Sequence, residues 1–337
     1  MKRVPATVVT LDGQELSGPE LALAAAQIDI GFGPSLDRAR LALGWLSPAA
    51  DVEPGAEMTV AVGYQDETET VLTGQVDAVS HRPWGFVVDV LATSAKLTRL
   101  RTGQAFIDSS VADIVESLAD EAGAAVGELE APMVLAAYHV DERRNAWRHV
   151  LDLAWLAGVD VSTEPDGGLT LKPAPDPGAA AGGLGAAVAS AVIPGAGGGL
   201  RYGAELVAWG LGPADTDRGE TRVFPYGAGS ELGAAKWHIV LKEPECGAPS
   251  GPVVLPGALR DREGATTLER ALAARTARRA TLGRVVVVGD QAHRAGDVID
   301  LAELPAGPSP RLRILRLTHV VSEGTGFLTH LDVEAAA

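Results

Sequence analysis

The chain has 337 residues, with 44 acidic and 28 basic side chains and a formal net charge of −16 at pH 7. That charge argues against a general attraction for nucleic acid or an anionic membrane, although a local basic patch stays open. The length exceeds one small core and predicts two or three modules. Glycine (40) and proline (21) are plentiful and aromatic residues make up 4%, which favours many short elements joined by turns.

The lone thiol and the N-terminal segment bear on where the chain folds. Cys246 cannot form an intrachain disulfide and has no Cys or His neighbour at metal-ligand spacing, so we expect a fold independent of an oxidising compartment. The N-terminus starts basic, but no unbroken apolar run follows before Asp12, which indicates that there is no signal peptide. We therefore expect a protein made in the cytoplasm that leaves the cell, if it does, by lysis or within a particle.

Residues 1–107 have the pattern of a first antiparallel β domain. Polar and apolar residues alternate in short β-branched runs, and turn pairs such as Asp12-Gly13 separate them. The expected strands are Thr7–Leu11, Gln27–Gly31, Arg38–Leu43, Met58–Tyr64, Thr70–Ser80 and Gly85–Ala92. Short strands with regular turns predict an antiparallel barrel or sandwich.

Residues 108–172 predict a small inserted α/β module. Ser110 and Asp113 form a capping box for a helix that ends at Gly123, and a second helix runs from about Asn145 to Gly158. Two short strands around the turn 165–168 follow as a hairpin.

Residues 173–200 are rich in Gly, Ala and Pro and carry no charge between Gly178 and Leu200. A membrane span is disfavoured because Gly and Ala dominate and Pro194 interrupts the run. The composition indicates a linker or a long loop.

Residues 201–337 return to a β pattern as a second β domain. One helix is expected from a cap at Thr266 to about residue 281. The expected strands are Ala204–Trp209, Arg284–Val288, Asp297–Leu301, Arg311–Ser322 and Gly326–Glu334, the last two as a hairpin. The exposed face of the expected helix carries Arg270, Arg275, Arg278 and Arg279. These arginines could form a surface that faces another subunit or a polyanion, or they could simply be a solvated helix face.

No catalytic, cofactor or metal site is predicted. The chain lacks a His-Glu-x-x-His zinc motif, a Gly-x-Ser-x-Gly nucleophile turn and a Gly-x-Gly-x-x-Gly phosphate loop. His319 and His330, on the last two expected strands, could face each other near Asp332, and these three residues are the best metal candidate in the chain.

Several segments, in order, resemble the phage late control D family of tail baseplate hub proteins, the hub region of VgrG spikes and the hubs of contractile injection systems. The segments that carry the resemblance are 71–79, 91–97, 110–122, 145–158, 159–171, 293–301 and 312–319. The segments 173–200 and 210–260 match it poorly.

The resemblance implies a fold and an assembly. It implies two tube-protein-like antiparallel β-barrels with a small inserted α/β module, in a homotrimer that joins a hexameric tail tube to a spike protein. Barrel strands would then pair between subunits around a watery lumen, which the net charge would make acidic. Other baseplate components are expected partners, with no membrane and no specific nucleic-acid binding. The sequence stops at Ala337 without a needle domain, so the spike is expected to be a separate polypeptide.

Two other function classes stay open. A tail-tip-associated cell-wall hydrolase or peptidase would use His319, His330 and Asp332 as a metal site. A carbohydrate-binding β module is the third possibility. The hub is favoured because no catalytic constellation matches a known mechanism.

Overall fold

A computed structural model describes residues 4–65, 67–174, 199–213, 222–223, 253–254, 257–259, 262–305 and 310–336. Cys246 and nearly all of the expected linker 173–200 lie outside these residues. No helix in the described part is long and apolar enough to cross a membrane.

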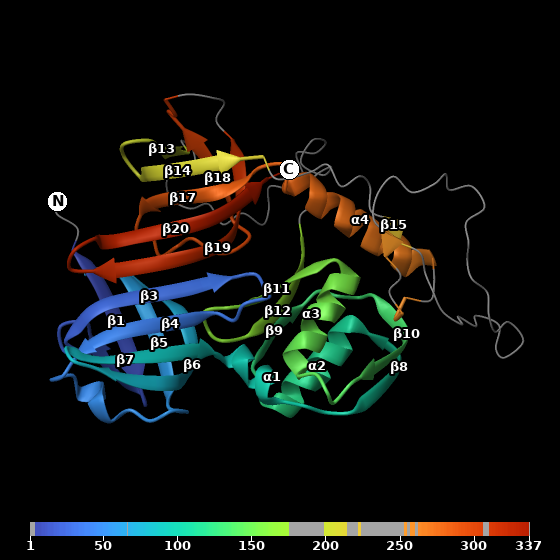
Figure 1. The fold of residues 1–337 in the computed structure, drawn as a ribbon, viewed down its shortest axis with the longest axis horizontal. Helices are drawn as coiled ribbons and strands as arrows, with labels where there is room; N and C mark the ends of the chain where they lie inside the picture. Colours follow the sequence, from blue (N-terminus) through green and yellow to red (C-terminus); the bar gives the residue numbers. More distant parts are fainter. Residues whose placement is uncertain are drawn as a thin grey trace, which may run out of the picture.

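One large sheet of 13 strands dominates the molecule, and strands from both ends of the chain contribute to it (Figure 1). Its strands are β1 (Pro5–Leu11), β2 (Gln14–Ser17), β3 (Leu23–Gly31), β4 (Arg38–Gly44), β5 (Glu57–Tyr64), β6 (Glu67–Arg82), β7 (Gly85–Ala92), β13 (Leu200–Arg201), β14 (Leu206–Gly212), β17 (Leu282–Val288), β18 (Val298–Ala302), β19 (Arg311–Ser322) and β20 (Gly326–Ala335). The order along the sheet is β14-β17-β20-β19-β3-β4-β7-β6-β5-β1-β2, with β18 beside β19 and β13 beside β18.

The two β-rich parts of the sequence meet where β19 pairs with β3. The pairing is antiparallel and runs from Arg316 opposite Gly31 to Ser322 opposite Ala25. Alternate residues of these strands enter one shared core that includes Ile28, Leu317 and Leu331. The β-rich class expected from the sequence is confirmed. Within the described residues the strands form one open sheet that no pairing closes into a barrel.

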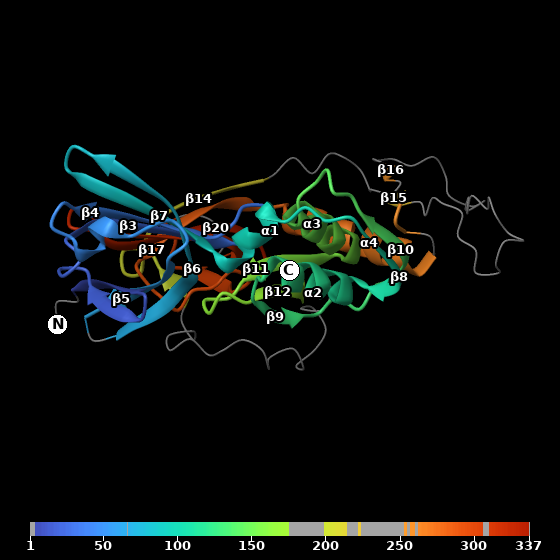
Figure 2. The same cartoon turned by 90° about the horizontal axis from the view of Figure 1, so that it is seen from below.

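The α/β module packs around its own core beside the sheet (Figures 1 and 2). Its elements are α1 (Lys96–Arg99), β8 (Gln104–Ser110), α2 (Val111–Ala122), β9 (Val126–Leu129), β10 (Val134–Val140), α3 (Ala146–Ala157), β11 (Val159–Thr163) and β12 (Leu169–Pro173). β10 pairs with β8, and β11, β12 and β9 form a three-stranded sheet. Two short 3₁₀ turns, η1 (Pro48–Asp51) and η2 (Thr93–Ala95), and a two-residue parallel pair, β15 (Arg222–Val223) with β16 (Val253–Val254), complete the elements.

The sequence signals for α2 and α3 are confirmed. The Ser110 hydroxyl accepts from the Asp113 N–H, and the Asp113 carboxylate accepts from the Ser110 N–H, which is the predicted capping box. Gly123 and Gly158 end the two helices in the left-handed conformation that glycine tolerates best.

Helix α4 (Arg262–Arg278) differs from the prediction at its start. Thr266 was expected as the cap, but the helix already begins at Arg262, so Thr266 lies within its first two turns. The capping-box pattern at 266–269 therefore misplaced the start. α4 contacts α3, and Leu268 is buried in the core of the module, so this helix from the C-terminal part of the chain covers the inserted module (Figure 1).

Candidate assembly surfaces

The outer face of the large sheet carries a row of cross-strand ion pairs. Arg38 and Asp29 are directly opposite on β4 and β3, with 2.9 Å between Nε and Oδ2. The pair Arg40–Asp89 joins β4 to β7 at 2.8 Å, and the pair on β17 and β20, Arg284–Asp332, is 2.9 Å apart. The arginines of these pairs are at least half exposed, and pairs so open to water stabilise a fold only slightly, so their main effect is to make this face polar and hydrated.

Two of these pairs, Arg38–Asp29 and Arg284–Asp332, border a shallow hollow of about 460 Å³ at the junction of β3, β19 and β20. Burial raises the pKa of Asp29, but hydrogen bonds from Thr318 Oγ1 at 2.7 Å and from Arg38 outweigh it and hold the pKa below its ordinary value. Arg316 also borders the hollow and makes none of the ion pairs found in the described part of the chain. Cations and carboxylates thus alternate here, so the acidic net charge of the chain is not concentrated on this face.

The three residues of the candidate metal site do not come together. The hairpin register sets His319 opposite Thr329 and Thr318 opposite His330, so the two histidines project from opposite faces of the sheet. His330 and Asp332 border the outer hollow, whereas His319 is fully buried in the core. Among the described residues, no group of three or more His, Cys, Asp or Glu side chains is arranged to hold a metal ion.

His319 instead packs in the core of the sheet. Its Nδ1 lies 2.9 Å from Thr329 Oγ1, and its Nε2 is buried without a hydrogen-bond partner. Burial, with smaller effects of Arg294 and His293, lowers the pKa of His319 to about 3. The imidazole is therefore neutral at physiological pH, which suits a packed core position.

Asp37 fastens the sheet to the α/β module. Its carboxylate accepts the Gly31 N–H at 2.8 Å and also a hydrogen bond from the Thr163 backbone, while its own carbonyl accepts the Ala92 N–H at 3.0 Å. Burial raises the pKa of Asp37 to about 7, against the opposing effect of these backbone donors and of Arg316. Asp37 was not singled out from the sequence, because an aspartate before a strand is usually a solvated turn residue.

A buried ion network connects α4 to the sheet. Glu334 Oε1 on β20 lies 2.8 Å from Arg278 Nε and 3.1 Å from an Arg313 amino group, and the other Arg313 amino group lies 2.7 Å from Asp160 on β11. The ring of Phe32 stacks on the Arg313 guanidinium, with 4.6 Å from Cζ to the ring centroid.

The network corrects the expected face of α4. Arg270 and Arg279 are exposed as predicted, but Arg278 is buried and Arg275 is partly buried. A glutamate and an arginine at inward positions of β20 and β19 could have suggested such a network, but their partner on α4 is far away in sequence.

Part of the large sheet is bounded by two strand edges, one on β14 and one on β6. Among the described residues β14 pairs along its length only with β17, and its other edge makes a single bridge, from Leu206 to Tyr202, and is free from Val207 onward. At the opposite end, β6 pairs with β5 no further than Gln75, so residues 77–82 have a strand neighbour, β7, on one side only. Eight strands lie between these edges in the order β14-β17-β20-β19-β3-β4-β7-β6. Free strand edges are templates for pairing with another chain.

An exposed apolar tip lies at one end of the sheet, where β4 and the β6–β7 hairpin turn. Trp45 and Trp84 are about half exposed, and Leu46 is 94% exposed. Trp45 donates its indole N–H to the Pro83 carbonyl at 3.3 Å and stacks on His81, so the tip is ordered although it is exposed. Exposed apolar clusters of this kind mark contact surfaces more often than catalytic ones.

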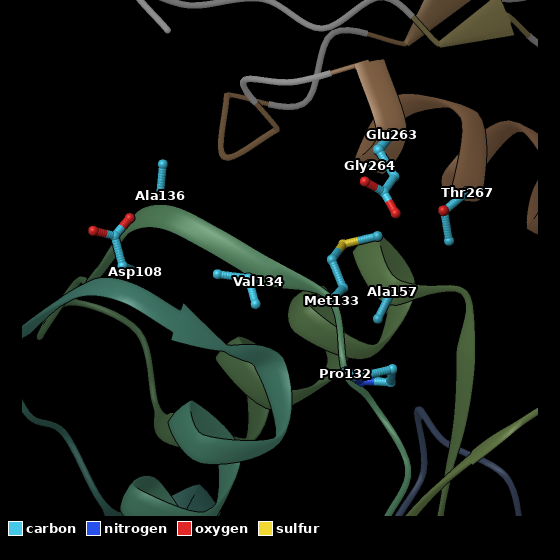
Figure 3. Close-up of a pocket in the computed structure, with 9 residues that line it drawn as sticks. All are labelled: Asp108, Pro132, Met133, Val134, Ala136, Ala157, Glu263, Gly264 and Thr267. Atoms are coloured by element: carbon cyan, nitrogen blue, oxygen red, sulfur yellow. The ribbon is translucent and has the colours of Figure 1, made fainter. Parts of the chain in front are cut away.

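A groove of about 560 Å³ separates the β8–β10 pair from the start of α4 (Figure 3). Asp108 lies on one wall, and Glu263 and Thr267 project from α4 on the other, with Met133 and Val134 between them. Among the described residues that line it there is no His, Cys, Lys or Tyr. The titratable side chains among these lining residues are the carboxylates of Asp108 and Glu263.

The fold is shared with solved structures of tail proteins. A tail protein from Neisseria meningitidis MC58 superposes with a TM-score of 0.70 at 16% identity, over 98% of this chain and 96% of that one. The 43 kDa tail protein of prophage MuSo2 from Shewanella oneidensis gives 0.65 at 16% identity, over 98% of both chains. The chain has a phage tail protein fold. The predicted resemblance is confirmed at the level of the fold.

The tail protein fold extends to secretion machinery. A component of the Escherichia coli type VI secretion system, described as structurally similar to the T4 tail proteins gp27 and gp5, matches with a TM-score of 0.61 at 11% identity, over 98% of this chain and 77% of that one. Neither protein-family models nor curated protein sequences gave a match. The likeness thus rests on the arrangement of strands and helices and not on shared residues.

Proposed function

We propose that the protein is a structural, non-enzymatic baseplate hub of a phage-tail-like contractile injection particle. In this role a homotrimer would join a hexameric tail tube to a spike protein, with other baseplate components around it. The support is the full-length likeness to tail proteins, together with the likeness to a secretion component described as similar to gp27 and gp5. The protein would be made in the cytoplasm and assembled into a particle.

The open sheet is the observation that supports a ring-shaped oligomer. Its two free edges, β14 and residues 77–82 of β6, differ from each other, so pairing between them is head-to-tail. Head-to-tail contacts that close by rotation make rings, and each copy would add eight strands to the ring wall. The polar outer face with its ion pairs is suited to a hydrated surface of that wall.

The proposed ring also suggests a role for each part of the chain. Residues 1–107 and 201–337 would be the two β domains of the ring, 108–172 the inserted module and 173–200 a linker. Two β domains in each of three subunits would present six similar units to a hexameric tube. The apolar tip at Trp45, Leu46 and Trp84 would be one of the surfaces that contact a neighbouring ring.

The proposal is tested by the mass and the partners of the purified protein. Light scattering after size exclusion is expected to give three times the 34.7 kDa of the chain. Co-expression with the tube and spike proteins of the same particle should yield a complex containing both. A stable monomer that binds neither protein would contradict the hub.

A catalytic role is tested on the same sample. The hydrolase alternative requires bound metal and His330-dependent activity on cell-wall fragments. A His330→Ala variant that assembles and binds partners as the wild type does would agree with the structural role.

A further inference from the structure

A second groove, of about 500 Å³, lies where α4 passes the loop between β3 and β4 and the strands β19 and β20. Phe32, Pro34 and Leu315 give it apolar walls. Five arginines also line it, against three carboxylates. In a chain with a net charge of −16, this local excess of cations is unusual.

The carboxylates of the groove already have partners. Glu334 holds Arg278 and Arg313, Asp160 holds Arg313, and Asp332 pairs with Arg284, which lies outside the groove. Each of these three carboxylates is therefore at least partly neutralised by an arginine other than Arg275, Arg279 and Arg316.

Three arginines of the groove are left over. Arg275, Arg279 and Arg316 make none of the ion pairs or side-chain hydrogen bonds found in the described part of the chain. Arg279 is exposed, whereas Arg275 is partly buried, and burial lowers its pKa despite the attraction of Asp160. A cation that is partly desolvated without a full partner is stabilised when an anion reaches it.

A buried donor in the groove also lacks a partner. Arg313 is 3% exposed, and its two amino groups are used, but its Nε is buried without a hydrogen-bond acceptor. Buried donors without acceptors are rare in folded proteins, and an ordered water or a bound group is a common acceptor for them.

We propose that this groove binds carboxylate groups of an acidic protein segment. Guanidinium groups form paired, charge-assisted hydrogen bonds with carboxylates, and apolar walls accommodate the stems of the side chains that carry them. The groove holds a few residues of peptide and is too small for a nucleic-acid duplex. The net charge of the chain would also repel an extended polyanion, whereas a short segment responds mainly to the nearby arginines.

The test uses hexaglutamate peptide as the probe and the full-length protein in low-salt buffer. Titration calorimetry is expected to show saturable binding at one site per chain, weakened by added salt. The double variant Arg275→Gln, Arg279→Gln should weaken binding about tenfold or more, because two charged hydrogen-bond donors are lost.

The matched control is Arg143→Gln, Arg148→Gln, which removes two exposed arginines outside the groove and changes the net charge equally. This control is expected to bind as the wild type does. Equal loss in both double variants, or no saturable binding by the wild type, would overturn the proposal. So would groove-dependent binding of a single-stranded oligonucleotide in preference to the peptide. None of these results tests the trimer, so the proposal for the groove can fail while the proposed hub function holds, and the reverse.

Discussion

At the scale of single residues, Asp37 makes stability fall as the pH rises from 3.8 to about 7. Its pKa is about 7 in the folded protein against an ordinary 3.8, so the folded state holds a proton that the unfolded chain has lost. Stability from this residue is therefore full below pH 3.8 and declines as pH rises toward 7, by up to about 1.4 kcal/mol per pH unit.

The Asp37→Asn substitution tests this effect. Asparagine keeps an acceptor for the Gly31 N–H but cannot ionise, so the unfolding free energy of the variant relative to wild type should rise between pH 5 and pH 8. Urea unfolding at both values measures it, with Glu53→Gln, an exposed carboxylate, as the control. A constant difference across that range would contradict the burial of a titrating Asp37.

His319 has the opposite effect and makes stability fall as the pH is lowered. Its pKa falls from 6.5 to about 3 on folding, mainly through burial. Between these values the unfolded chain binds a proton that the folded chain does not, so stability is lost as pH falls through that window. Calorimetric melting at pH 7, 6 and 5 should show a smaller acid-induced loss for His319→Gln than for wild type. The exposed His139→Gln is the control and should follow wild type; an unchanged acid response in His319→Gln would argue against the buried neutral imidazole.

The register of one hairpin explains why the candidate metal residues were wrongly paired from the sequence. Two histidines eleven positions apart across a turn can face each other only if the pairing offset has the right parity. The observed pairing of His319 with Thr329 has the other parity and separates them by the thickness of the sheet. A shift of one residue moves a side chain to the other face, and turn length alone did not fix it.

At the scale of elements, local sequence signals were sufficient to predict the two helices of the α/β module. The capping box at Ser110 and the glycines after α2 and α3 determine both helices through short-range hydrogen bonds and backbone conformation. α4 was misjudged at its start because the capping-box pattern at 266–269 was preferred over Asp261, a residue type also favoured at the N-cap, which directly precedes Arg262 in the sequence. Packing of Ala265 and Leu268 on the module stabilises the longer helix.

The attachment of α4 through Glu334 can be tested directly. The Glu334→Gln substitution removes the carboxylate that Arg278 and Arg313 share, which leaves cationic groups that are 3–4% exposed without full compensation. We expect a loss of about 3–5 kcal/mol in unfolding free energy. We also expect faster amide hydrogen exchange in α4 than in α2, which the network does not touch.

The control for Glu334 is Glu323→Gln, an exposed glutamate in the β19–β20 turn. It should leave the urea midpoint and the exchange rates unchanged. Slow exchange in α4 of the Glu334 variant, at wild-type rates, would show that apolar packing on the module suffices to hold the helix.

At the scale of the whole molecule, the sheet joins parts of the chain that are almost 300 residues apart. The alternation of polar and apolar residues predicted the strands of each β-rich part. The resemblance to tail hub proteins predicted how the strands group into domains. The direct pairing of β3 with β19 was not predicted, because two strands of similar composition carry no local mark of their neighbour. The consequence is one wall with two unlike edges in place of two separate closed units.

The unlike edges lead to a prediction about assembly. In a Cys246→Ser background, cysteines would be placed on β14 at Ala208 and, in turn, on β6 at Ala78, Val79 or Ser80. Head-to-tail pairing brings the two edges of different subunits within disulfide distance, so at least one of the double variants should form a covalent trimer on oxidation. Non-reducing electrophoresis measures the product.

The single-cysteine variants distinguish a head-to-tail ring from a two-fold dimer. Each presents only one of the two edges, so a head-to-tail ring leaves its thiols apart and the chain should run as a monomer. A covalent dimer from the Ala208→Cys variant alone would mean that β14 pairs with its own copy about a two-fold axis, which is incompatible with a three-fold ring through these edges. The parity of the successful double variant would also fix the register between subunits, and hence which face of β14 continues the polar wall.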